Sequence, residues 1–156
     1  MQEPIQNIAD TIAAAISPRD KPSRACCSRE PTPQMVKAFA EFNRGLYWEQ
    51  HETLEGVWRA ESDPSIRNFY KGIIQVGVGF HHLTKHNYRG VMKVLARGIN
   101  YLKPYAPDCC GVDVSRLIQE ASKIYFRAQD LGPERMGEIT AAELPKLVYR
   151  ADGGGS

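Results

Sequence analysis

Residues 68–82 read NFYKGIIQVGVGFHH. Over residues 73–80, apolar side chains fall on nearly every side of a helical turn, which is typical of a helix surrounded by other helices. Three glycines inside it (Gly72, Gly77 and Gly79) each cost a helix about 1 kcal/mol relative to alanine. They therefore predict that a neighbouring helix packs very close. We expect this stretch to form the central helix of the protein.

Helical spacing of apolar residues continues on both sides of this stretch, and no sustained apolar–polar alternation predicts a strand. Pro64, preceded by Ser62 and Asp63 as capping residues, marks the start of the central helix. Gly45 marks the end of an earlier helix. We expect helices over about residues 33–43, 47–60, 64–85, 87–103 and 113–129, with a short sixth helix after Thr140. The prediction is an all-α fold, a compact bundle of five to six helices.

The chain of 156 residues is long enough to bury one real core. We divide it into an N-terminal arm with a short helix and linker (1–32), a helical core domain (33–130) and a C-terminal extension with a disordered, glycine-rich end (131–156). The net charge of +2, from 20 basic and 18 acidic residues, gives no global attraction to nucleic acid or anionic membrane. Because no membrane span or secretory signal is apparent, we expect a cytoplasmic protein without a membrane partner.

A polar cluster is predicted on the helix that precedes the central one. Residues 47–58 read YWEQHETLEGVW, and a rotation of about 100° per residue places His51 and Glu55 within an aromatic, apolar stripe. The stripe also holds Tyr47, Trp48, Leu54 and Trp58. On the central helix, Gln75 shares a face with His82, whereas His81 lies on another face. Since buried imidazoles and carboxylates need partners, we expect Gln75 to hydrogen-bond His51 or Glu55.

Two interpretations of this cluster stay open. In the first, His51, Glu55, Gln75 and a histidine of the central helix form a satisfied polar network that fixes helix packing. In the second, they line a pocket as metal ligands or as a general acid–base pair. The candidate catalytic residues are then His51, Glu52 and Glu55, and the candidate ligands of a divalent metal are His51, Glu55 and His82. A zinc protease is disfavoured, because a glutamate stands where the zincin helix has its second histidine.

Two motifs resemble those of a known family. The first, from Phe42 to Trp58, reads F-N-x-G-x-Y-x-x-x-H-E-x-L-E-x-x-W. The second begins at Tyr70 as Y-x-G-I-I-Q and continues through the histidine pair to N-x-x-G at 87–90 and L-x-R-G at 95–98. Together they resemble the domain of unknown function 309 family (DUF309) over about residues 42–105. The resemblance implies an all-helical fold without an established activity, and it directs attention to His51, Glu52, Glu55, Trp58, Gln75 and a histidine of the central helix.

A row of basic residues is the next feature. Lys85, Arg89, Lys93 and Arg97 recur at every fourth position, although Asn87 is expected to begin a new helix and to break the row after Lys85. A solvated helix face is the ordinary explanation, and weak nucleic-acid binding is the alternative. The guanidinium of Arg97 has a further use as a bidentate partner of Glu52 or Glu55.

The four cysteines form two adjacent pairs, Cys26-Cys27 and Cys109-Cys110. Neither pair has the spacing of a zinc ribbon, so reduced thiols in loops are the expected state. The alternatives are a disulfide between the pairs and a site for a soft metal.

The sequence thus predicts an uncharacterised helical domain whose polar cluster has a structural or interaction role. A metal-dependent, hydrolase-like enzyme is the alternative, and whether the protein is an enzyme is left open. No cofactor is predicted apart from the divalent metal of that alternative. A homodimer through exposed aromatic residues rests only on the two tryptophans and seven tyrosines.

Overall fold

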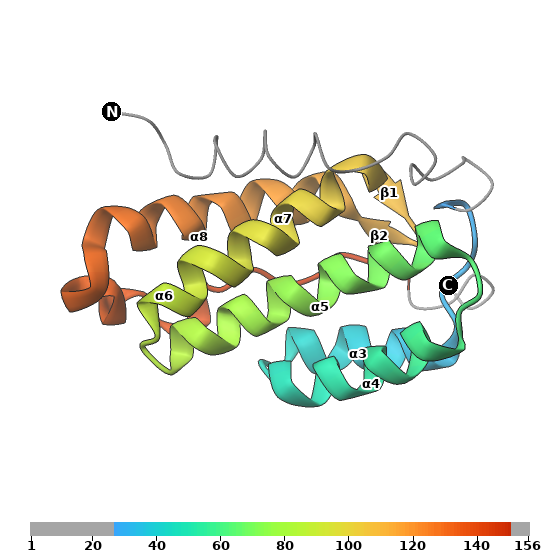
Figure 1. Cartoon of the computed structure of the whole chain (residues 1–156), viewed down its shortest axis with the longest axis horizontal. Coiled ribbons are helices and arrows are strands. Elements are labelled where there is room, and N and C mark those ends of the chain that lie inside the picture. Colours follow the sequence, from blue (N-terminus) through green and yellow to red (C-terminus); the bar gives the residue numbers. More distant parts are fainter. Residues whose placement is uncertain (1–26, 151–156) are drawn as a thin grey trace.

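The computed structural model describes residues 27–150, and it confirms the predicted helical bundle (Figure 1). Its long elements are α3 (Pro33–Asn43), α4 (Tyr47–Ala60), α5 (Pro64–Thr84), the run of α6 (Tyr88–Gly90), η2 (Val91–Leu95) and α7 (Ala96–Leu102), and α8 (Val114–Arg135). Short 3₁₀ turns η3 (Lys103–Tyr105), η4 (Met136–Glu138) and η5 (Ala141–Glu143) connect them. The short helix expected in the N-terminal arm and the glycine-rich end of the chain lie outside the described residues.

The predicted helix starts are confirmed, and a side chain caps each of them except that of α4, which follows Leu46. Thr32 accepts a hydrogen bond from the Met35 backbone N–H at 3.2 Å, and Asp63 accepts one from the N–H of Ser65 at 3.0 Å. The corresponding caps of α6 and α8 are Asn87 and Asp113. Each cap satisfies a donor that the first turn of a helix leaves without a partner.

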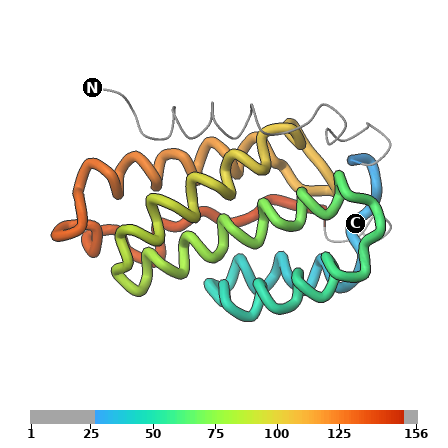
Figure 2. Tube along the Cα trace, viewed as in Figure 1, coloured from blue at the N-terminus to red at the C-terminus, as the bar shows by residue number. Residues whose placement is uncertain are grey.

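Helix α5 lies at the centre, with α4 on one side and the η2–α7 run on the other (Figures 1 and 2). The close approach predicted from the glycines is confirmed. A Cβ atom built on Gly79 would lie 2.8 Å from the Cβ of Leu95, and one on Gly98 would lie 2.7 Å from the backbone N of Val76. Side chains crowd two other glycines of α5, that of Leu102 at Gly72 and that of Gln50, from α4, at Gly77. The backbones of α5 and η2–α7 are therefore close enough that only glycine fits between them.

A two-stranded hairpin departs from the prediction. β1 (Asp108–Cys109) pairs antiparallel with β2 (Val112–Asp113), and the strands are too short for their alternation to be visible in the sequence. Helix α8 also extends beyond the predicted end, although Gly132 interrupts its helical backbone with a φ of 77°. The predicted sixth helix is reduced to η5.

The segment after α8 returns along the whole bundle to the hairpin (Figure 2). Asn43, at the end of α3, fixes it by two hydrogen bonds to the backbone of Leu147: its Nδ2 donates to the carbonyl at 3.0 Å and its Oδ1 accepts from the N–H at 2.6 Å. Val112 and Tyr149 then form an isolated antiparallel bridge. This returning segment therefore closes the core beside the hairpin, where Leu144 and Leu147 are buried.

Candidate functional site

A cavity of about 340 Å³ lies over the middle of α5, between α4 and the η2–α7 run. We call it the central cavity. Its lining residues are His51, Glu55 and Trp58 from α4, Lys71, Ile74, Gln75 and Val78 from α5, Val94 from η2 and Arg97 from α7. Five residues selected from the sequence therefore meet around one cavity, although they come from three helical segments.

His51 is held in place by two contacts. Its ring stacks on Trp48, with centroids 4.8 Å apart and planes 20° from parallel. Its Nε2 lies 3.4 Å from Oε2 of Glu55, one helical turn along α4. The remaining ring nitrogen, Nδ1, is buried and has no hydrogen-bond partner among the described residues. The ring is therefore oriented by its neighbours while one of its polar atoms is left without a partner.

Glu55 lies between two positively charged or chargeable groups. In addition to the contact with His51, Nη2 of Arg59 lies 3.3 Å from Oε1, the other carboxylate oxygen of Glu55. The hydrogen bond expected from Gln75 to His51 or Glu55 is absent from the described residues, and Oε1 of Gln75 is buried without a partner. The polar groups thus line the central cavity without completing a satisfied network among themselves.

Lys71 and Arg97 bring two cations to the central cavity. Lys71 lies beside the ring of Tyr101, with Nζ 5.3 Å from the ring centroid. Within residues 27–150, neither Lys71 nor Arg97 forms an ion pair, so the bidentate contact expected between Arg97 and a glutamate does not occur. Trp58, at the edge of the cavity, is covered by the guanidinium of Arg67 at 4.4 Å.

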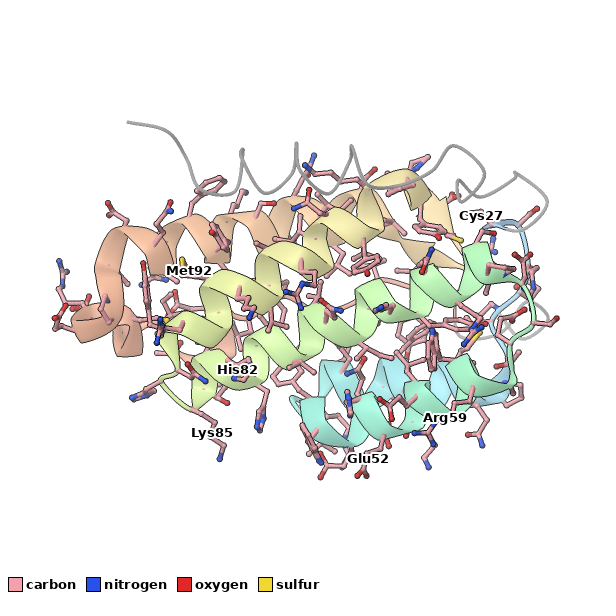
Figure 3. The ribbon with its side chains drawn as sticks, viewed as in Figure 1. Cys27, Glu52, Arg59, His82, Lys85 and Met92 are labelled. Atoms are coloured by element: carbon pink, nitrogen blue, oxygen red, sulfur yellow. The ribbon has the colours of Figure 1, made fainter. Side chains whose placement is uncertain are left out.

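Three residues predicted for the site lie outside the central cavity. His82 faces the start of α6, where its Nδ1 lies 3.2 Å from Nδ2 of Asn87, and burial together with the nearby His81 lowers its pKa (Figure 3). Glu52 is exposed on the outer side of α4 (Figure 3). His81 lies against Trp48, with ring centroids 5.8 Å apart.

The predicted metal set of His51, Glu55 and His82 therefore does not assemble around the cavity. Across the described chain, no three histidine, cysteine or acidic side chains form a group that could hold a metal ion. The physical reason is distance along the helix axis: His82 lies two turns beyond Gln75, on the part of α5 that packs against Gly90.

Sequence reasoning missed several residues here. Gln50 is fully buried and its Nε2 donates to the carbonyl of Tyr47 at 3.1 Å, whereas Trp48, placed in the buried stripe, is 50% exposed. Lys71 was also missed, although a lone charge beside the apolar stretch of the central helix was a usable signal. The buried face of α4 is thus rotated toward Gln50 relative to the predicted stripe.

The basic row divides as predicted, because Asn87 separates Lys85 from the other members. Lys85 lies at the end of α5, and Arg89 and Lys93 are exposed on the next helical run. Arg97 alone lines the central cavity. The row is therefore split between a solvated surface and the candidate site.

The two motifs noted in the sequence run from the end of α3 through α4 and α5 to η2 and the start of α7, and they cover the elements that form the central cavity. Residues 35–94 match the family model of DUF309, a domain of unknown function. The predicted resemblance is confirmed over this stretch. The DUF309 match includes the cavity residues of α4 and α5, whereas Arg97 lies just beyond it.

One curated relative is similar to this chain, the uncharacterized protein YpuF of Bacillus subtilis (strain 168). The two are 28% identical over 115 residues, which span 66% of each protein. No solved structure matches the chain. In the described part of the chain, no helix combines the length and the apolar character that a bilayer crossing needs.

Proposed function

We propose that the central cavity binds a small organic anion, a molecule with an apolar body and one carboxylate or phosphate group. The observation that supports this most directly is the presence of Lys71 and Arg97 in one cavity without an ion-pair partner in residues 27–150. Glu55 also lines the cavity, but His51 and Arg59 contact its carboxylate, so Lys71 and Arg97 remain as two cations that a bound anion would neutralise. The guanidinium fork of Arg97 matches the geometry of a carboxylate or phosphate.

The other lining residues fit the apolar body of such a ligand. Ile74, Val78, Val94 and Trp58 provide apolar surface, and the cavity volume of about 340 Å³ is typical of small-molecule sites. Two of the lining residues, His51 and Gln75, add polar character to this mostly apolar wall.

Isothermal titration calorimetry on the full chain tests the proposal. Matched pairs of a carboxylic acid and its amide, such as phenylacetate and phenylacetamide, probe the requirement for charge, and phosphate monoesters extend the series. We expect at least one acid or phosphate to bind while its neutral partner does not. Loss of a charge-assisted hydrogen bond costs about 1.5–3 kcal/mol, so Arg97→Gln should weaken binding by roughly 10- to 100-fold.

Lys93→Gln is the matched control, because Lys93 precedes Arg97 by one turn and is exposed outside the central cavity. It removes the same charge and should leave the affinity unchanged. Equal binding of acid and amide would contradict the proposal, and so would equal losses in Arg97→Gln and Lys93→Gln, which would indicate a diffuse surface effect.

The contact between His51 and Glu55 favours a second role, in which the oriented imidazole moves a proton on the bound molecule. The metal-dependent hydrolase predicted from the sequence is one form of this role. A metal would need ligands beyond His51 and Glu55, because catalytic zinc sites use three protein ligands. Elemental analysis of protein purified without chelators distinguishes this metal-dependent form from proton transfer without a metal. Stoichiometric zinc, manganese or iron that is lost in His51→Ala would favour the hydrolase.

A further inference from the structure

A second group of reactive side chains lies far from the central cavity, where the chain ahead of α3 meets the hairpin. The backbone N–H of Cys110 donates to the carbonyl of Cys27 at 2.8 Å, so Cys27 lies beside the pair Cys109-Cys110. The Sγ atoms of Cys109 and Cys110 are 4.0 Å apart. All three residues carry thiols in this structure. Figure 3 shows Cys27 beside the hairpin.

The turn of the hairpin is strained in a way that serves this arrangement. Cys110 has a φ of 50° and the following Gly111 has a φ of 81°, which places both turn residues in the left-handed region. Turns of this kind favour Asn-Gly or Gly-Gly, and a side chain such as cysteine is disfavoured at the first position. Strain of this kind tends to be kept where it serves a function. Here it holds Cys109 and Cys110 against Cys27.

The three thiols are chemically unequal. A hydrogen bond to Cys110, together with burial and a hydrogen bond to Cys27, raises the pKa of Cys109. The hydrogen bond from Cys109 lowers the pKa of Cys110, and the charge of Arg29 acts in the same direction against the effect of burial. Cys109 therefore carries the proton that the two neighbouring thiols share and directs it at Cys110, while Cys27 is the most accessible of the three.

We propose that Cys27 and Cys109 form a reversible intramolecular disulfide by exchange with a small-molecule disulfide. Cys27 borders a cavity of about 630 Å³ formed with the hairpin and the returning segment, so a small molecule has access to its sulfur. Its thiolate attacks one sulfur of the incoming disulfide, whose S–S bond breaks and releases the first thiol. Cys109 passes its proton to Cys110 and attacks the sulfur of Cys27, which releases the second thiol. Two protein thiols are oxidised, and one disulfide is reduced to two thiols.

Two competing arrangements are less consistent with the geometry. A disulfide between Cys109 and Cys110 would join neighbouring residues, whose Cα atoms are about 3.8 Å apart, closer than in ordinary disulfides. A metal held by the three sulfurs would require a ligand group that the described residues do not form. The pair Cys27 and Cys109 joins two chain segments that a backbone hydrogen bond already holds together.

Mass spectrometry on the full chain tests the proposal. The protein is incubated with oxidised glutathione, remaining thiols are alkylated, and the chain is cut with trypsin without reduction. We expect one cross-linked pair, of residues 25–29 with residues 98–116, and fragment ions should assign the bond to Cys27 and Cys109. Because this assignment is made on the wild-type protein, it does not depend on whether any variant folds.

Variants then separate the sulfurs within each pair. Cys26→Ser should keep the cross-link and Cys27→Ser should abolish it, and these two form a matched pair at adjacent positions. Cys109→Ala should also abolish the cross-link, with glutathione left on Cys27. Cys110→Ala should keep the cross-link but form it more slowly, because the proton acceptor is lost. A bond assigned to Cys26 or Cys110, a disulfide between two chains, or a cross-link that survives in Cys27→Ser would overturn the proposal.

Discussion

Gly79→Ala tests how tightly α5 packs against the π-helical turn η2. The added Cβ would lie 2.8 Å from the Cβ of Leu95, 2.9 Å from its Cα and 3.1 Å from its backbone N, all below the 3.4–4 Å of ordinary contacts. Two of these atoms are backbone, so no side-chain rotation relieves the clash and the two helices must separate. Overpacking of this kind costs about 1–3 kcal/mol. Helix propensity returns about 1 kcal/mol, so we expect a net loss of up to about 2 kcal/mol.

Gly56→Ala in α4 is the matched control. It is also inside a helix, but nothing lies within 4 Å of the position that its added Cβ would take. It should therefore stabilise the protein by up to about 1 kcal/mol, from helix propensity alone. Urea unfolding followed by far-UV circular dichroism measures both variants. If Gly79→Ala stabilises the protein as much as Gly56→Ala does, the close approach of α5 and η2 is not present in solution and the reasoning fails.

Three further predictions concern pH and the returning segment. Burial raises the pKa of Tyr47 to about 12. The stability that its neutral side chain contributes is therefore present below pH ~10 and is lost as the pH rises toward 12. Tyr47→Phe should reduce this alkaline loss of stability, measured by urea unfolding. Burial opposes ionisation of Glu61, but hydrogen bonds from the Arg29 side chain, the Asp63 backbone and the Tyr70 hydroxyl hold its pKa below the usual value. Its stabilising contribution is therefore lost as the pH falls below ~4, and Glu61→Gln should flatten that acid limb whereas Glu134→Gln should not. Asn43→Ala removes both hydrogen bonds to Leu147 and should cost about 1–3 kcal/mol and speed proteolysis of the returning segment; an unchanged cleavage rate would mean that other contacts hold it.

The helix boundaries were predictable because they depend on local chemistry. Thr32, Asp63 and Asn87 cap their own helices through side-chain hydrogen bonds to residues two or three positions away, and such spacings are visible in a sequence. Gly45 ends α3 with a φ of 78°, which again requires only local information. The position of α5 at the centre followed from its continuous apolar surface.

The candidate site was predictable only in part. A helical wheel gives the side of a helix on which a residue lies, but it does not give the level at which that residue meets the neighbouring helix. Gln75 and His82 share a predicted face, yet Gln75 lies beside α4 and the cavity while His82 packs against Gly90. The same limitation put Trp48 in the buried stripe and left out Gln50. The hairpin was missed for another reason: two-residue strands carry no periodicity, and Gly111 was the one local signal.

The π-helical turn η2 has a consequence for how this protein can change its length. A π-helical turn holds one residue more than an α-helical turn. Deleting one residue from Val91–Leu95 would therefore restore a regular α-helical turn and leave the residues that follow at nearly the same angle. Arg97 would keep its place at the central cavity, and Gly98 would keep its place against the backbone of Val76. Relatives that keep this cavity can therefore lack one residue within η2, whereas a deletion in the regular helix on either side of it would rotate Arg97 by about 100°.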